Sequence, residues 1–319
     1  MKTANDASEE ADPVWPPLPL EEWKWTHDTL HMWTQIVGKV KLELSPFLNE
    51  WWEVAFAVTA RGLTTSTIPW RNGVFEVTFD FIDHNLRVLT SGGAVKAIPL
   101  IPRSVADFYH EFMATLRALG IDVTINPQPA EVENGIPFDQ DHLHASYDAD
   151  AVHRWWRILV QVERVLQKYR SSFVGKSSPI QFFWGSFDLC ETRFSGRPAP
   201  EREWPKGSRW MRFAMDQEHA TSGFWPGSGK IQEPAFFANI YPEPAGFRSM
   251  GVRPDPAFWD PEWGVFILRY EDVRRAAAPE RMILGFFEST YAAGATLAQW
   301  DRAALERRAP QNRRGGGGA

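Results

Sequence analysis

The chain has 319 residues, of which 44% are hydrophobic and 23% are charged, and its formal net charge at pH 7 is −6. This balance predicts a globular protein with a sizeable core and argues against a nucleic-acid partner, which needs a concentrated basic surface. Cys190 is the only cysteine, which excludes an intramolecular disulfide and fits a reducing compartment. Since no apolar run reaches the roughly 18 residues of a membrane span, we expect a cytoplasmic protein without a membrane partner.

Composition and periodicity divide the chain into five segments. They are a flexible acidic, Pro-rich tail (1–24), a first α+β unit (25–126), a linker (127–147), a second α+β unit (148–305) with a long inserted loop (197–234), and a disordered basic, Gly-rich tail (306–319). The inserted loop has no counterpart in the first unit. Long loops on a rigid scaffold are commonly functional.

In the first unit, Thr26 and Asp28 supply helix-start chemistry, and the helix ends at Ser45-Pro46. Its apolar stripe consists of Trp33, Val37, Val40 and Leu44. Alternating apolar and polar residues predict half-buried strands over 52–58, 75–81, 86–90 and 94–100. A capping box at Ser104 opens a second helix, which Gly120 ends, and 121–125 is expected to form a short strand.

The second unit repeats this order. A long helix begins at Asp148, strands are expected near 180–187, 190–194, 235–241 and 265–270, and Pro279 fits the first residue of a last helix. Two helices also open similarly, with Leu30-His31-Met32-Trp33 and Val152-His153-Arg154-Trp155. We therefore predict an α+β fold of two tandem helix–antiparallel sheet–helix units, arising by internal duplication and packed as one compact body. A structural role for the paired histidines is favoured over a proton switch.

The main candidate site lies in the second unit, where charged, hydroxyl and aromatic side chains gather around the inserted loop. The leading prediction is a pocket that binds a small molecule, with Arg193 holding an anionic group and Trp184 and Trp225 contacting a flat or sugar-like body. The full set of expected ligand-binding residues is Trp184, Asp188, Glu191, Ser222, Trp225 and Tyr241. A structural explanation is favoured about two to one for Arg193 itself, as the partner of a carboxylate that clamps the loop to the sheet.

Two other functions remain open. The first is a metal-independent hydrolase or transferase, in which Glu218 or His219 is the general base and Arg193 binds an anion. The second is a scaffold that binds another protein through exposed tryptophan, of which the chain has 16. Phosphate-loop, dinucleotide-binding, nucleophile-elbow and paired Cys-x-x-Cys motifs are missing from the sequence, so we expect no cofactor and no metal.

A second cluster comprises Asp139, Asp141, His142 and His144. The two histidines would project to the same side of an extended segment, as metal ligands do. A solvated acidic linker is the favoured interpretation.

Six sequence blocks resemble a bacterial family defined only as domain-of-unknown-function family 5996. They are Trp33–Val40, Arg61–Ser66, Phe79–His84, Arg103–Tyr109, Phe183–Leu189 and Gly223–Gly227. The resemblance spans about Trp25 to Leu305 and implies a stand-alone soluble protein, without implying an activity, cofactor or catalytic residue. One departure is Gln217-Glu218-His219 where the family leads us to expect His-Glu ahead of the last block.

Overall fold

The computed structural model describes residues 13–203, 211–228 and 231–307. The first half contains the helices α1 (Leu20–Leu44) and α2 (Val105–Ala118) and six strands: β1 (Ala57–Val58), β2 (Gly62–Thr64), β3 (Ile68–Trp70), β4 (Gly73–Asp80), β5 (Asn85–Thr90) and β6 (Val95–Pro99). A connection with one 3-10 turn, η1 (Phe138–Gln140), leads to the second half. In the part of the chain described, no helix is long and apolar enough to cross a membrane.

The second half begins with α3 (Ala149–Ser171) and ends with α6 (Pro279–Leu297) and α7 (Arg302–Leu305). Between them lie β7 (Gln181–Phe183), β8 (Asp188–Pro198), α4 (Met211–Ala214), β9 (Gln217–Trp225), β10 (Ala235–Tyr241), η2 (Phe247–Ser249), β11 (Phe258–Asp260), β12 (Val265–Arg269) and α5 (Tyr270–Arg274). The fold is therefore α+β, as predicted.

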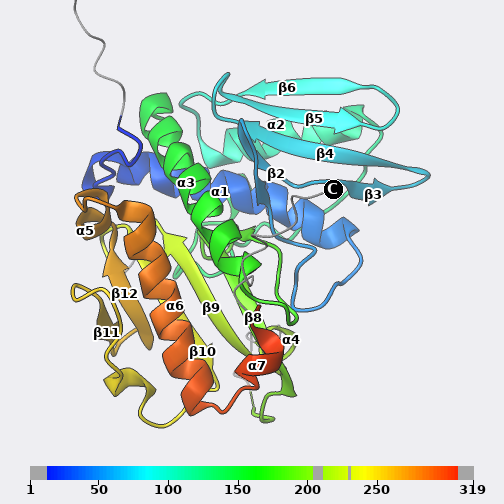
Figure 1. The fold of residues 1–319 in the computed structure, drawn as a ribbon. Helices are drawn as coiled ribbons and strands as arrows, with labels where there is room; N and C mark the ends of the chain where they lie inside the picture. The colour runs from blue at the N-terminus through cyan, green and yellow to red at the C-terminus, as the bar shows by residue number, and fades with distance from the viewer. Residues whose placement is uncertain (1–12, 204–210, 229–230, 308–319) are drawn as a thin grey trace, which may run out of the picture.

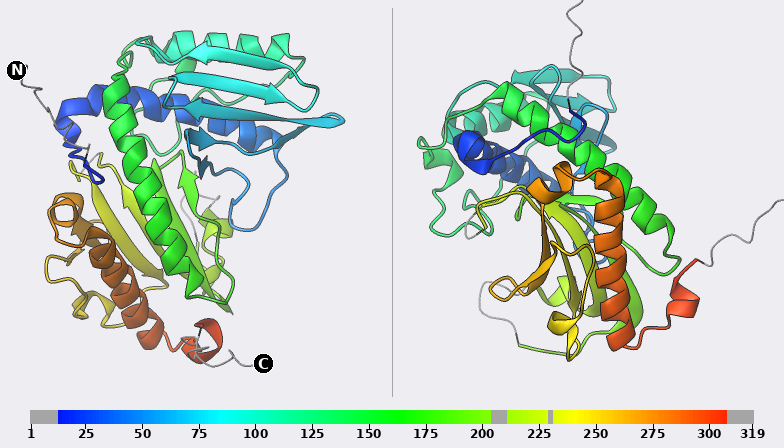
Figure 2. Two further views of the ribbon diagram at one scale, coloured as in Figure 1. Left: turned by 45° about the horizontal axis from the view of Figure 1, so that its top comes forward. Right: turned by 60° about the vertical axis from the view of Figure 1, so that its left-hand side comes forward.

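The two sheets are antiparallel throughout. One has the order β1-β2-β4-β5-β6, with β3 added beside β4, and the other has the order β11-β12-β10-β9-β8-β7. Figure 1 shows α3 and α6 lying across one face of the second sheet, and Figure 2 shows α1 passing between the two halves. Both halves thus have a helix, an antiparallel sheet and a covering helix in the same order, while internal duplication stays a prediction.

A joint between the sheets makes the two halves continuous. Phe56 and Phe182 exchange two backbone hydrogen bonds of 2.9 Å each, next to β1 and within β7. The buried apolar side chains around this joint belong to one core that includes residues of both halves, among them Trp33, Phe81, Trp155 and Phe187. Because a shared core cannot be divided without exposing large aromatic side chains, the halves form a single folding unit.

Helix boundaries follow local chemistry in three cases. Ser104 caps α2 by accepting a 3.0 Å hydrogen bond from the Asp107 amide, Asp148 caps α3 in the same way, and Pro279 is the first residue of α6. The predicted start of the first helix at Thr26 and Asp28 is wrong, because the helix begins at Leu20 with only the fixed backbone of Pro19 before it.

Two predicted strand segments also differ. Residues 51–54 form turns, and residues 121–125 do not form a strand.

Two predicted segments, the flexible tail 1–24 and the inserted loop 197–234, differ from the structure in the residues that the structure describes. Trp15 and Leu18 are buried, and the Tyr270 hydroxyl donates to the Pro16 carbonyl at 2.7 Å, so the chain is packed well before residue 25. The supposed loop contains β9, a central strand paired with β8 and β10. Within β9, a Cβ at Gly223 would lie 2.6 Å from the Leu189 carbonyl oxygen, so the glycine permits close strand approach. Of the basic tail, only residues up to 307 are described.

Candidate functional site

Arg193 lies deep in the interior, between the second sheet and the helices that cover it. Its position on β8 directs it to the same face as Glu191, and its Nε is 3.6 Å from a Glu191 carboxylate oxygen. Its guanidinium carbon lies 3.4 Å from the ring centroid of Tyr169 on α3 and 4.7 Å from that of Tyr291 on α6. It also donates to the Tyr169 carbonyl. Arg193 is 2% exposed and Glu191 is 0% exposed, so this cation is enclosed by the protein.

The closed Glu191–Arg193 pair overturns the predicted anion pocket around Arg193. Burial raises the pKa of Glu191 to about 7 despite the attraction of Arg193, and neither carboxylate oxygen has a hydrogen-bond partner among the described residues. Trp184 and Trp225 do not flank Arg193. Trp184 donates to the Val54 carbonyl at 2.9 Å, and Trp225 packs on Trp263 with 4.5 Å between centroids. The structural explanation, an arginine paired with a carboxylate, fits this geometry.

The expected acid–base residues on β9 do not converge. Glu218 is held by Arg197 at 2.6 Å and by the Ser195 hydroxyl at 2.9 Å. His219 points to the opposite face of the sheet, because neighbouring strand residues alternate. Its ring lies between Phe194 and Tyr241, and its Nδ1 is 2.8 Å from the Gln217 carbonyl oxygen.

Burial lowers the pKa of His219, so its neutral form is favoured. Ser222 faces the helices, 3.5 Å from the Tyr169 hydroxyl. Burial raises the pKa of Cys190 well above its usual range, which disfavours the thiolate that a nucleophile requires.

Asp188 is the one predicted site residue that joins a new polar cluster, at the junction of the halves. Ser186 and Cys190 hydrogen-bond its carboxyl group, and burial raises its pKa to about 6. Glu131, from the linker, packs its carboxyl end against Gly185, where a Cβ would lie 2.5 Å from Oε1. Glu131 is exposed as a whole residue, and desolvation of its carboxyl group together with the charge of Asp188 raises its pKa to about 7.

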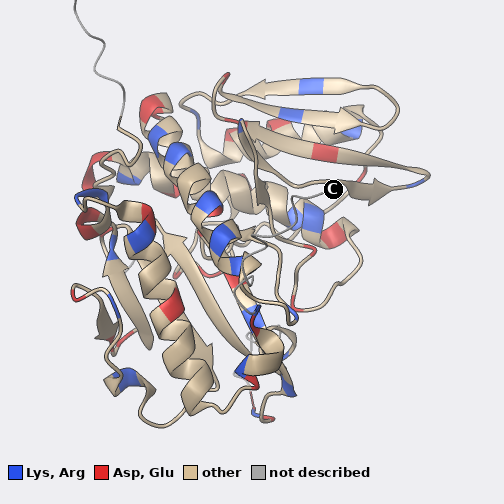
Figure 3. Cartoon of the chain, in the orientation of Figure 1, with Lys and Arg blue, Asp and Glu red and all other residues tan. Residues whose placement is uncertain are grey.

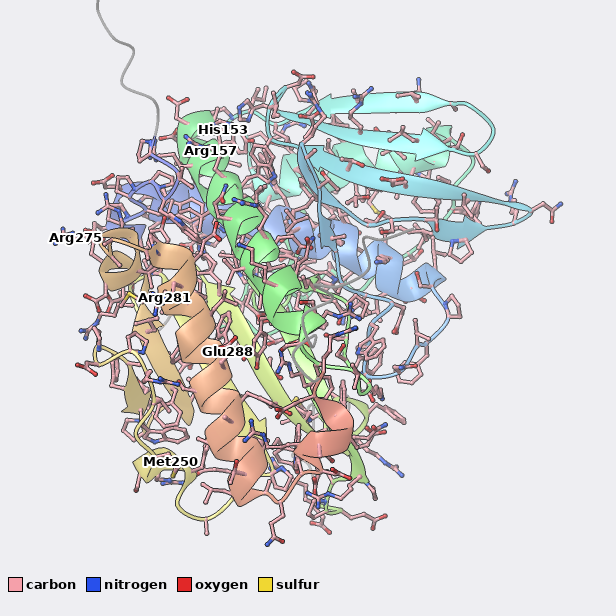
Figure 4. All side chains as sticks on the ribbon, in the orientation of Figure 1. His153, Arg157, Met250, Arg275, Arg281 and Glu288 are labelled. Carbon is pink, nitrogen blue, oxygen red and sulfur yellow. The ribbon has the colours of Figure 1, made fainter. Side chains whose placement is uncertain are left out.

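His31 and Gln35 of α1 complete this cluster. The Nε2 atom of His31 lies 2.9 Å from the Gly185 carbonyl oxygen and 3.0 Å from Nε2 of Gln35. Gln35 in turn holds the linker, since its side-chain oxygen accepts from the Ala130 amide at 2.7 Å. Burial lowers the pKa of His31 to about 4, which favours its neutral form. His153, its predicted counterpart, lies instead on the outer side of α3 (Figure 4).

The Asp139–His144 cluster has a local structural role. Asp141 accepts from the Leu143 and His144 amides at 3.1 Å each, and its other oxygen is 2.7 Å from the His144 ring. Its carbonyl accepts from the Ala106 amide at the start of α2. Among the residues described, no group of three or more His, Cys, Asp or Glu is placed to hold a metal ion.

Two hollows stand out on the described surface. One, of about 450 Å³, lies between α3 and α6 and is lined by Lys168, Ala278, Pro279, Glu280, Arg281 and Leu284. Basic residues follow the outer side of α3 above it (Figure 3), and Arg281 is labelled at the start of α6 in Figure 4. Two of its charged residues are already paired, since Glu280 accepts Lys168 at 2.5 Å and also lies 3.6 Å from Arg164.

The second hollow, of about 360 Å³, is here named the Lys41 cavity. It is formed by the last turn of α1, the connection after it and the turn between β2 and β3. Its lining residues are Lys41, Ser45, Pro46, Phe47, Leu48, Glu53, Thr65, Ser66, Thr67 and Pro69. Asn49, Trp51 and Ser66, in these two connections, have φ values of 49°, 63° and 55°. Left-handed backbone at non-glycine residues is unfavourable and is found preferentially at functional sites.

Among the described residues, Lys41 is the only cation that lines this cavity, and it is 7% exposed. Its ammonium group donates to the Ala55 carbonyl and makes no ion pair with any residue in the described ranges. Burial lowers its pKa to about 8, although the charge of Glu53 opposes this. Ser66 and Thr67 are exposed, and their hydroxyls have no partner in the described parts of the chain. The arrangement combines one weakly compensated cation, free hydroxyls and an apolar wall.

Aromatic side chains of both halves meet at the rim of the Lys41 cavity. Phe47 is 51% exposed and lies 5.0 Å from Trp51 and 5.2 Å from Phe213 of α4, centroid to centroid. The segment expected as the inserted loop therefore contributes to the surroundings of a cavity in the first half.

The residue pattern of α1 contains one signal for Lys41, which the predicted site did not include. Lys41 follows Val37 by four residues and precedes Leu44 by three, so it lies beside the apolar stripe of α1 rather than on its polar side. A lysine in that place either packs its aliphatic chain against the apolar stripe or brings a buried charge to a functional site. The cavity itself could not be predicted, because it depends on two turns with unusual backbone.

A model of the DUF5996 family, described as a family of unknown function, matches residues 15–307, and the chain belongs to this family. No curated protein and no solved structure matches the chain.

Proposed function

We propose that this member of the DUF5996 family binds a small organic anion in the Lys41 cavity. The observation that carries the proposal is the buried ammonium of Lys41, a residue that lines an open hollow and makes no ion pair within the described chain. A buried charge without a partner is unfavourable, and an anionic ligand would supply the missing compensation. The anion predicted from the sequence thus stays in the proposal, while its binding residue changes from Arg193 to Lys41.

Apart from the Glu53 carboxylate, the rest of the wall supports a ligand with a small polar head. The hydroxyls of Ser66 and Thr67 can donate to a carboxylate or phosphate oxygen, and Pro46, Phe47 and Pro69 offer apolar contact. A volume of about 360 Å³ is at the lower end for ligand sites. We therefore expect a ligand of metabolite size, which the protein would bind in the cytoplasm. We expect no nucleic-acid partner, because the net charge is −6.

Titration calorimetry with propionate, pyruvate and methyl phosphate tests the proposal. We expect at least one of these anions to bind, and Lys41→Met to weaken it tenfold or more, equivalent to about 1.4 kcal/mol. Lys39→Met is the matched control, since Lys39 is on the same helix but outside the cavity wall. Equal affinity of Lys41→Met and wild type, or no binding by any of the three anions, would reject the site.

A second candidate function is docking of another protein on the exposed aromatic rim. Phe47, Leu48 and Phe213 are 51%, 51% and 46% exposed, which is unusual for side chains of this size in one place. Phe213→Ser should then impair partner binding while leaving anion affinity in the Lys41 cavity unchanged. A variant with unchanged partner recovery would rule out this role.

A further inference from the structure

Resting on the proposed anion site, we infer that Lys41 forms an imine with the carbonyl group of a small 2-oxo acid in the Lys41 cavity. A salt bridge alone needs only a cation at the surface, whereas Lys41 is an amine held at the wall of a hollow with 7% exposure. A lysine in such a place loses its ammonium proton more easily than an exposed lysine. The neutral amine is the form that attacks carbonyl groups to form Schiff bases.

The groups around Lys41 match the two functional groups of a 2-oxo acid. The free hydroxyls of Ser66 and Thr67 suit the carboxylate, and the Lys41 amine suits the adjacent carbonyl carbon. Glu53 lines the same cavity, and one of its carboxylate oxygens accepts from the Leu48 amide at 3.0 Å. This hydrogen bond fixes Glu53 within the wall, where it can accept and return protons.

The step is balanced without an oxidant or reductant. The ammonium first loses a proton, and the neutral amine attacks the carbonyl carbon, forming a C–N bond while the carbonyl oxygen takes up a proton. The nitrogen then loses one proton, which gives a neutral carbinolamine. A proton delivered to its hydroxyl breaks the C–O bond and releases water, and loss of the last proton on nitrogen leaves the C=N bond. One amine and one carbonyl yield one C=N bond and one water, with Glu53 and solvent as the proton carriers.

Reductive trapping on the full-length chain tests this inference. The protein is incubated with pyruvate and sodium cyanoborohydride at pH 7.5, and the labelled lysines are located by peptide mass mapping. We expect Lys41 to be labelled at least about tenfold faster than the exposed Lys96, because each unit of lower pKa raises the neutral fraction up to tenfold. Propionate, which has no ketone, should slow the labelling by competition.

Calorimetry without reductant separates imine formation from anion binding, because propionate has no ketone and should still bind to wild type. Lys41→Arg has no primary amine at position 41 and should lose the label there. If pyruvate binds in calorimetry without reductant but Lys41 is labelled no faster than Lys96, the imine is rejected and the anion site stands. If neither pyruvate nor propionate binds and Lys41 is not labelled selectively, both proposals fail.

Discussion

The indole of Trp184 lies directly on Gly38 of α1, where a Cβ would be only 2.3 Å from the indole nitrogen. Trp184 comes from the turn after β7, and its indole N–H donates to the Val54 carbonyl in the first half. Gly38 is therefore a contact point between the halves, occupied by glycine because the indole fills the space of a side chain.

Gly38→Ala should lower the free energy of unfolding by about 1–3 kcal/mol, the usual cost of overpacking. Alanine is the better helix former by about 1 kcal/mol, so a loss would come from the clash alone. Gly285→Ala is the control, since Gly285 lies within α6 with no atom within 4 Å of its added Cβ. Urea denaturation should show Gly285→Ala to be more stable than wild type, and a stable Gly38→Ala would disprove the contact.

Arg193→Met should cost about 3–5 kcal/mol at pH 7, because it leaves Glu191 buried without its paired cation. The double variant Arg193→Met with Glu191→Leu should recover at least half of that loss, since both charges are then gone. A double-mutant cycle by urea denaturation measures the coupling. Additive effects of the two changes would show that the 3.6 Å pair contributes little.

The pair Asp188 and Glu131 predicts a dependence of stability on pH. Their pKa values in the folded protein, about 6 and about 7, lie above the ordinary values near 4, so the folded state binds more protons than the unfolded chain at pH 4 to 7. Their contribution to stability is thus present at low pH and is lost as pH rises through 6 to 7. Asp188→Asn should reduce the dependence of the free energy of unfolding on pH. Asp122→Asn, at an exposed position, should leave that dependence unchanged.

Lys41→Met should not destabilise the protein at pH 7 by more than about 1 kcal/mol. Removing a buried ammonium is favourable, while the Ala55 carbonyl loses its donor, and the two effects offset each other. Because burial lowers the pKa of Lys41 to about 8, wild type should gain stability relative to Lys41→Met as pH rises from 8 towards 10.5. A loss of 3 kcal/mol or more at pH 7 would make Lys41 a structural residue.

Much of the fold was predictable because the main elements have strong periodicity. Phe75, Val77 and Phe79 alternate with polar residues, and they form the buried face of β4 as expected. Residues 52–58 alternate equally well, but Trp51 has a φ of 63° and the chain turns there, since local alternation contains no information on tertiary constraints. Strand β9 falls within the predicted inserted loop, and its Gly223, a residue that weakens most strands, permits a close strand contact in the sheet.

The site was less predictable than the fold. The shared face of Glu191 and Arg193 follows from their spacing on a strand, but the depth of that face depends on α3 and α6, more than twenty and eighty residues away in the chain. The place of Lys41 beside the apolar stripe of α1 could be recognised in the sequence, whereas nothing in the sequence around Glu131 indicated a special environment. The surroundings of the Glu131 carboxyl group come from Gly185 and Asp188, which belong to the other half.

The position of α1 has a consequence for the order of folding during synthesis. The helix packs Trp33 on Phe108 of the first half, and Trp23 on Trp155 and Gly38 on Trp184 of the second. Its preceding segment contacts Tyr270. The ribosome must therefore release most of the chain before this helix finds all its partners, and such long-range contacts slow folding. A nascent chain that stops after α2 should keep aromatic surface exposed and require a chaperone to remain monomeric.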